Sequence, residues 1–227
     1  MNLEINKNNL FGGKLMAINR NAQTGFHYEN TEKKDKNFMY NNLKRANCYN
    51  CNFSGSNFDF TCLRGAHFKK CGFIKCSFKN AEFIGSNLKG CKFKNAMFEN
   101  TVFEGVNLDA ADFKDAQFKN VIFVGTDVTK ARNLNTNNLE IKIYDEMPEL
   151  EISDDLKAAV ETAMENKYVK ASRVFDTKDG SINTITMMTL LEKFDEKKLI
   201  RALNKLAEEV DRDFYTVSYI VKRIKMQ

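Results

Sequence analysis

The chain has 227 residues, a hydrophobic content of 43 % and a formal net charge of +5, which suits one large or two modest globular domains. No window approaches the roughly 18 consecutive apolar residues of a membrane span, and the start MNLEINKNNL lacks a basic segment followed by an apolar run. We therefore expect neither a membrane span nor a signal peptide, reduced cysteines and a cytoplasmic location.

Residues 1–36 are expected to form an N-terminal segment or cap. They contain two weak, out-of-phase echoes of the repeat that follows, NLFGG and KLMAI. The stretch FGGKL is not a phosphate-binding loop, because the residues needed between its glycines are absent.

Residues 37–135 repeat every five residues. From Leu43 to Val128 there are 18 successive centre positions, of which 12 are Phe and four are Leu. The residue two places before each centre is small in every unit but the first, and the residue two places after it is often Gly or Asn. Such a period is typical of a solenoid.

A large and a small residue two places apart point the same way on extended backbone, and Gly or Asn suits the turn that follows. Each unit is therefore a short side and a corner, and four units close a square coil. Stacked coils would pair like parallel strands, roughly 4.8 Å apart. The pattern predicts that Phe83, Leu88, Phe93 and Phe98 point into one core on four successive sides.

The units ANCYN, SNFDF, SNLKG and AADFKDAQFKN resemble the pentapeptide repeat family over about residues 37–135. The resemblance implies a right-handed quadrilateral β-helix. It also implies one possible role, because some family members protect DNA gyrase from quinolones and several look like mimics of duplex DNA. Mimicry needs an acidic rod, whereas this rod is basic, so gyrase or topoisomerase binding is an alternative rather than the leading interpretation.

Most cysteines fall on core positions of the repeat. Cys51, Cys71 and Cys91 are 20 residues apart and are expected to stack in one column. CYNC, from Cys48 to Cys51, has the spacing of half a zinc site, but no second half follows, so we expect no metal. Cys62 precedes a centre by one place and is predicted to be an exposed, reactive thiol.

No catalytic set is apparent in the sequence. The two histidines, His27 and His67, form no nucleophile–base pair that can be read from their positions. Outward carboxylates such as Glu82, Glu99 and Glu104 are interpreted as solvated surface. We expect a protein that is not an enzyme and needs no cofactor.

Charge is concentrated on the repeat. Residues 37–135 hold 14 Lys and Arg against 8 Asp and Glu, whereas residues 136–227 are net acidic. The alternatives are a solvated face or a contact site for an acidic partner, including nucleic acid. The candidate basic interaction surface consists of Lys69, Lys89, Lys92, Lys94 and Lys114.

One side of the repeat carries apolar residues at outward places, namely Ile84, Val102, Ile122 and Val124. An outward apolar cluster normally marks a contact. The partner is either the rest of this chain, another protein or a second copy.

The chain changes character after residue 135. Residues 136–152 are predicted to be a linker with a short strand, and residues 153–227 an α-helical domain. We expect four helices there, with Ser153, Asp195 and Asp213 as N-caps of the first, third and fourth. This domain is predicted to cap an open end of the rod, to dimerise or to bind DNA. Its last 35 or so residues resemble the C-terminal helices of DnaD-type primosomal proteins, without the aromatic residue that normally ends that motif.

The leading hypothesis is a non-enzymatic protein-interaction scaffold of the pentapeptide repeat family, contacted by an unknown protein partner through the basic surface of the rod. A DNA-associated protein that uses the rod and the helical tail is the other alternative. A homodimer through the helical domain or a rod end is compatible with both.

Overall fold

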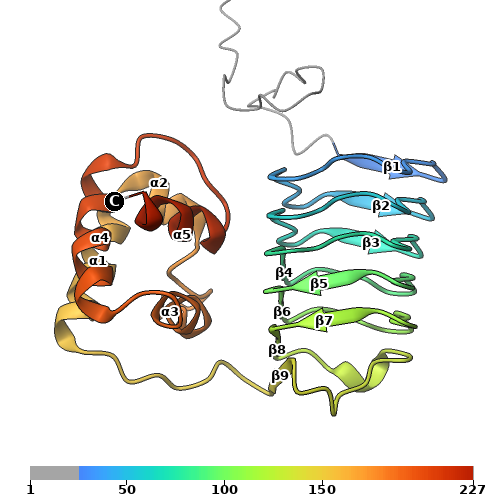
Figure 1. The fold of residues 1–227 in the computed structure, drawn as a ribbon. Helices are drawn as coiled ribbons and strands as arrows, with labels where there is room; N and C mark the ends of the chain where they lie inside the picture. The colour runs from blue at the N-terminus through green and yellow to red at the C-terminus, as the bar shows by residue number, and fades with distance from the viewer. Residues whose placement is uncertain (1–25, 227) are drawn as a thin grey trace, which may run out of the picture.

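The computed structural model describes residues 26–226, and the two N-terminal repeat echoes lie outside them. The described chain forms a rod of stacked square coils with a helical domain beside it (Figure 1). The predicted fold class, a pentapeptide-type β-solenoid followed by α-helices, is confirmed. Its strands are β1 (His27–Glu29), β2 (Asn47–Tyr49), β3 (His67–Lys69), β4 (Glu82–Ile84), β5 (Met97–Glu99), β6 (Val102–Glu104), β7 (Gln117–Lys119), β8 (Val121–Val124) and β9 (Ile141–Tyr144).

Residues 20 apart pair in parallel from coil to coil, as a five-residue unit repeated four times requires. Phe83 pairs with Phe103, and Phe103 with Phe123, in the sheet β4-β6-β8-β9. The other sheets are β1-β2-β3 and β5-β7, and the fourth side is held by isolated bridges such as Gly72 with Lys92. We call the four sides face A, which carries β5 and β7; face B, which carries β4, β6, β8 and β9; face C, which carries β1 to β3; and face D, which contains Phe73, Phe93 and Phe113.

The core of the rod consists of stacked aromatic rings. Phe83, Leu88, Phe93 and Phe98 are all buried, one on each of four successive sides. Phe93 lies between Phe73 and Phe113, with ring centroids 5.3 and 4.9 Å away and nearly parallel planes. The inside of the rod is therefore a continuous apolar column.

The corners of the coils explain why Gly or Asn often stands two places after the centre residue of a unit. Asn80 and Asn95 have φ angles of 53° and 56°, in the left-handed region that Gly and Asn enter most easily. Tyr40 and Phe60 occupy the same kind of corner with φ angles of 61° and 58°, and their rings stack with centroids 4.8 Å apart. The stack offsets part of the cost of a bulky residue in this conformation.

The coils extend beyond the predicted repeat at both ends. Within residues 26–226, coil pairing runs from β1, where His27 pairs with Asn47, to β9, where Tyr144 pairs with Val124. The first coil was missed because Lys33 interrupts the apolar pattern, with its ammonium group 4.3 Å from the centre of the Tyr28 ring. Near the other end, the 3₁₀ helix η1 (Val128–Lys130) is part of the last coil.

The helical domain has its own apolar core, in which α1 packs against α4. Its helices are α1 (Asp154–Glu165), α2 (Lys167–Ser172), α3 (Thr184–Leu191), α4 (Glu196–Glu209) and α5 (Val217–Lys225). Ser153 and Asp195 cap α1 and α4 as predicted, by accepting hydrogen bonds from the amides of Leu156 and Lys198.

Two details of the helical domain differ from the prediction. The sequence reading missed α2, a short helix that begins directly after Asn166. Asp213 is not the cap of α5, because this helix begins only at Val217, and its N-cap Thr216 makes no side-chain capping bond.

The helical domain lies along the side of the rod, next to face B, and does not cap a rod end (Figure 1). A linker without helix or strand leads from β9 to α1. Thr184 at the start of α3 donates a hydrogen bond of 2.7 Å to the carbonyl of Pro148 in this linker. No described helix is both long and apolar enough to cross a membrane.

Candidate interaction site

The five lysines of the predicted basic surface lie on two adjoining faces of the rod. Lys69 and Lys89 are on face C, and Lys92, Lys94 and Lys114 are on face D. All five side chains are exposed. Face D is the side opposite face B, so the helical domain leaves it uncovered (Figure 1).

Pairing of charges separates the later coils of face D from faces A and C; in the first coil of face D, Lys34 lies 2.9 Å from Glu32. On face A, Glu99 lies between Lys79 and Lys119, at 2.9 and 3.4 Å from their ammonium groups. On face C, Lys89 lies 3.3 Å from Asp109. The face A column alternates in sign from coil to coil, which removes most of the repulsion between neighbours, whereas the face C column runs Lys69, Lys89, Asp109 and its ion pair joins the last two.

One outward column of face D lacks this alternation, whereas the other runs Lys92, Asp112, Arg132 in register. Lys94 and Lys114 succeed each other in one column, so their backbones are about 4.8 Å apart. Within residues 26–226, neither these two nor Lys92 forms an ion pair. Asp112 lies on the same face, but its carboxylate accepts hydrogen bonds from the backbone amide of Lys114 and from the Asn133 side chain.

The outward apolar residues contact the rest of this chain. Ile122 and Val124 of face B form a cluster with Ile185 of α3, and Val102 and Met188 pack against it. Ile84 lines the adjoining cavity between the rod and the helices. Three partners were considered for this surface, and in the described structure the chain's own helical domain packs against it.

The prediction for Cys62 is wrong. Its thiol points outward from the rod, as predicted, but only 3 % of the residue is exposed. Cys62 lies on face B, in register with Glu82 of the next coil and two residues before Arg64, and both Arg64 and Glu82 hydrogen-bond to the helical domain. Burial, with the nearby Glu82 carboxylate, raises the pKa of the Cys62 thiol to about 11, so it is not a reactive thiol in this conformation.

Cys51, Cys71 and Cys91 lie buried in one column inside the rod. The Cys51 amide lies 3.4 Å from the Cys71 sulfur, and the Cys91 thiol donates to the carbonyl of Phe68 at 2.5 Å. Burial raises the pKa of the Cys71 thiol to about 12 and that of Cys91 well above its usual value. In the described residues, no group of three or more His, Cys, Asp or Glu side chains is arranged to hold a metal ion.

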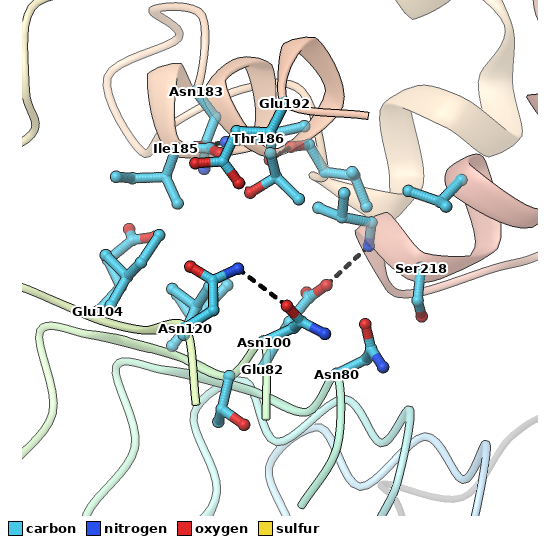
Figure 2. Close-up of a pocket in the computed structure, with 18 of the residues that line it drawn as sticks. Asn80, Glu82, Asn100, Glu104, Asn120, Asn183, Ile185, Thr186, Glu192 and Ser218 are labelled. Atoms are coloured by element: carbon cyan, nitrogen blue, oxygen red, sulfur yellow. Dashed lines mark hydrogen bonds between the residues drawn. The ribbon is translucent and has the colours of Figure 1, made fainter. Parts of the chain in front are cut away.

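A small cavity separates face B from α3 and α5 (Figure 2). Its volume is about 50 Å³, whereas pockets for drug-sized ligands have volumes of about 300–1,000 Å³. Along one edge, the corner residues Asn100 and Asn120 form a ladder, with a hydrogen bond of 2.8 Å between their side chains. The cavity is too small for an organic substrate and is a junction between two parts of the chain.

Glu82 is the central polar residue of this junction, although the sequence reading assigned it to the solvated surface. The residue is only 7 % exposed, and its carboxylate accepts a hydrogen bond of 2.6 Å from the Val217 amide at the start of α5 (Figure 2). Burial raises the pKa of Glu82 to about 7, against the opposing effects of the Val217 amide and the Arg64 guanidinium. Burial also raises the pKa of nearby Glu104.

Two further polar contacts join the rod to the helical domain. The Arg64 side chain donates a hydrogen bond of 3.2 Å to the carbonyl of Arg173, which follows α2. Lys142 of β9 forms an ion pair of 3.1 Å with Glu192, just after α3. No signal in the sequence identifies these pairs, because their members are between 50 and 135 residues apart.

The two histidines do not lie together in a site. His27 and His67 are exposed on face C, with Asn47 between them in the sheet.

Family models for pentapeptide repeats match the rod at residues 37–69, 68–112 and 78–132. The rod is a pentapeptide repeat domain. No curated protein sequence matches the chain.

Solved structures of other pentapeptide repeat proteins are similar to the chain. Rfr23 from the cyanobacterium Cyanothece 51142 is 16 % identical, with a TM-score of 0.31, over 52 % of this chain and 83 % of Rfr23. A protein of the Arabidopsis thaliana thylakoid lumen is 21 % identical, with a TM-score of 0.32, over 72 % of this chain and 90 % of that protein.

Full-length QnrB1, a plasmid-mediated fluoroquinolone resistance protein, is 13 % identical, with a TM-score of 0.24, over 58 % of this chain and 86 % of QnrB1. At these TM-scores, none of the three likenesses carries an argument about function.

Proposed function

We propose that this pentapeptide repeat protein is a non-enzymatic scaffold that binds an acidic protein partner through face D of the rod. The observation that carries the proposal is the unpaired column of Lys94 and Lys114 with Lys92 beside it, on a side that the helical domain leaves open. Exposed lysines at Lys69 and Lys89 extend the positive potential around the corner to face C.

The arrangement favours recognition by charge rather than by a pocket. Three ammonium groups that form no ion pair, with Asp112 as the one carboxylate in register beside Lys92, produce a net positive potential that steers an acidic surface toward this side. Such a contact weakens as salt rises, because ions screen exposed charges over about 10 Å at 0.1 M ionic strength.

The test is affinity capture from native lysate with the wild type and with the triple variant Lys92→Glu, Lys94→Glu and Lys114→Glu. We expect the variant to keep the circular dichroism of the wild type, because exposed charges contribute only about 0–1 kcal/mol each to stability. It should capture at most a tenth as much partner, and the wild-type complex should dissociate as salt rises.

A matched variant with the same change in net charge, Lys157→Glu, Lys178→Glu and Lys197→Glu, reverses exposed lysines of the helical domain. It should capture the partner as the wild type does. Equal loss in both variants would show that only net charge matters, and unchanged capture by the face D variant would overturn the proposal. Nuclease treatment distinguishes the protein partner from nucleic acid: loss of capture after treatment would favour the DNA-associated alternative.

A further inference from the structure

We propose that the helical domain is a reversible cover over face B of the rod, and that Glu82 is the pH-dependent latch that controls its opening. The cover is attached to the rod by a linker, a small apolar cluster and three polar contacts rather than by a shared core. Opening exposes the apolar row Val102, Ile122 and Val124 and the thiol of Cys62.

The first argument is the division of the core. The rod and the helical domain have separate apolar clusters, each closed on itself. Only a third, small cluster joins them, with Ile122, Val124 and Ile185 as its buried members. Separation of the two parts therefore leaves both cores intact.

The second argument is the unusual start of α5. Ser153, Asn166, Asn183 and Asp195 cap α1 to α4 with their own side chains, whereas Thr216 makes no such bond for α5. Glu82, from the rod, accepts the hydrogen bond of the Val217 amide instead. The first turn of α5 is thus complete only while the domain is docked.

The third argument is the environment of the Glu82 carboxylate. Arg64 and Glu104 act on it from neighbouring coils, and Glu192 and Lys193, after α3, line the same cavity. Arg64 interacts with several groups at once, since it lowers the pKa of both Glu82 and Glu104 and also hydrogen-bonds to the Arg173 carbonyl. Arg64 is therefore shared between Glu82 and other groups, and burial has the largest effect on the pKa of Glu82.

Burial sets the direction of the pH dependence. The docked pKa of Glu82 is raised from 4.5 to about 7, and exposure to water in the open state returns it toward its ordinary value. A raised docked pKa means that docking is tightest at low pH, where the carboxyl group is neutral in both states, and weakens as pH rises through about 7. Between pH 6 and pH 8, the docking equilibrium should fall by about tenfold.

Cys62 reports the opening directly. It lies on the covered face, whereas the other five cysteines are buried at core positions of the rod. The experiment measures the rate of Cys62 labelling by N-ethylmaleimide and divides it by the rate in Ile185→Asp, a variant whose cover is held open, at the same pH. This ratio gives the open fraction and cancels the effect of pH on the thiol itself.

We expect the ratio to rise by about tenfold from pH 6 to pH 8 in the wild type. In Glu82→Gln, which keeps an acceptor for the Val217 amide but cannot titrate, the rise should be less than about threefold, with Glu104 as the source of the remainder. Glu99→Gln, a matched change on uncovered face A, should behave like the wild type.

A second readout covers the case in which Ile185→Asp does not fold. Amide hydrogen exchange in the first turn of α5, corrected for the intrinsic rate at each pH, should accelerate by the same factor in the wild type and not in Glu82→Gln. A wild-type open fraction that stays constant or falls with pH, or a full tenfold rise in Glu82→Gln, would overturn the proposal.

Discussion

At the scale of single residues, position within the five-residue unit decides whether a side chain is inside or outside the rod. Phe93 occupies a centre position and is enclosed between the Phe73 and Phe113 rings. Met97 occupies an outward position only four residues later and is 50 % exposed. The chemical type of the residue matters less than the place, since both are large and apolar.

This contrast leads to a prediction about stability. Phe93→Ala should lower the free energy of unfolding by about 3–5 kcal/mol, because coils fixed by hydrogen bonds above and below cannot collapse around the void. Met97→Ala is the matched control and should cost under about 1 kcal/mol. Urea denaturation followed by circular dichroism measures both, and a loss below about 1 kcal/mol for Phe93→Ala would contradict the stacked core.

At the scale of elements, the backbone groups of a coil form their hydrogen bonds with the coils before and after it in the stack. Lys92 donates its amide to the carbonyl of Cys71 in the coil before, at 2.9 Å, and Phe93 donates to Asp112 in the coil after, at 2.7 Å. Helices α1 and α4 follow the opposite rule, because they satisfy amides of their first turns through local caps.

The local cap of α4 can be tested on its own. Asp195 accepts the Lys198 amide at 2.8 Å, so Asp195→Ala should lower the free energy of unfolding of the helical domain by about 1 kcal/mol. Asp211→Ala, which removes an exposed carboxylate outside any helix, is the control and should have an effect of less than about 0.5 kcal/mol. Thermal unfolding at 222 nm distinguishes the two, and equal midpoints would show that the cap contributes nothing.

At the scale of the whole molecule, the rod presents two unlike sides. Face B is apolar in the coils that contain Val102, Ile122 and Val124 and is covered by the helical domain, whereas face D is basic and open. A partner on face D and the helical domain on face B therefore do not compete for the same surface. In the proposed function, a partner on face D would therefore stay bound while the helical domain opens or closes.

The narrow contact predicts how the whole molecule responds to one change. Ile185→Asp places a charge in the joining cluster, where the residue is 3 % exposed, and should detach the helical domain while both cores stay folded. The radius of gyration from small-angle X-ray scattering should increase, with unchanged helical content by circular dichroism. Met97→Asp on uncovered face A should leave the radius unchanged, and a compact Ile185→Asp variant would show that other contacts hold the domain.

The sequence alone determined the core of the rod, the parallel stacking of its coils and most of the helices. It did so because the five-residue period and the helical caps are local, and each unit repeats the same backbone geometry. The predictions for Phe83, Leu88 and the cysteine column needed no knowledge of which distant segments meet.

Only the tertiary structure decided what covers the outside of the rod. Cys62 and Glu82 occupy outward positions, and their burial depends on a helical domain more than 100 residues away in the chain. The late start of α5 has the same origin, since the acceptor for its first amide comes from the rod. An outward position fixes the direction of a side chain, but its exposure, pKa and reactivity follow from the segment that packs against it.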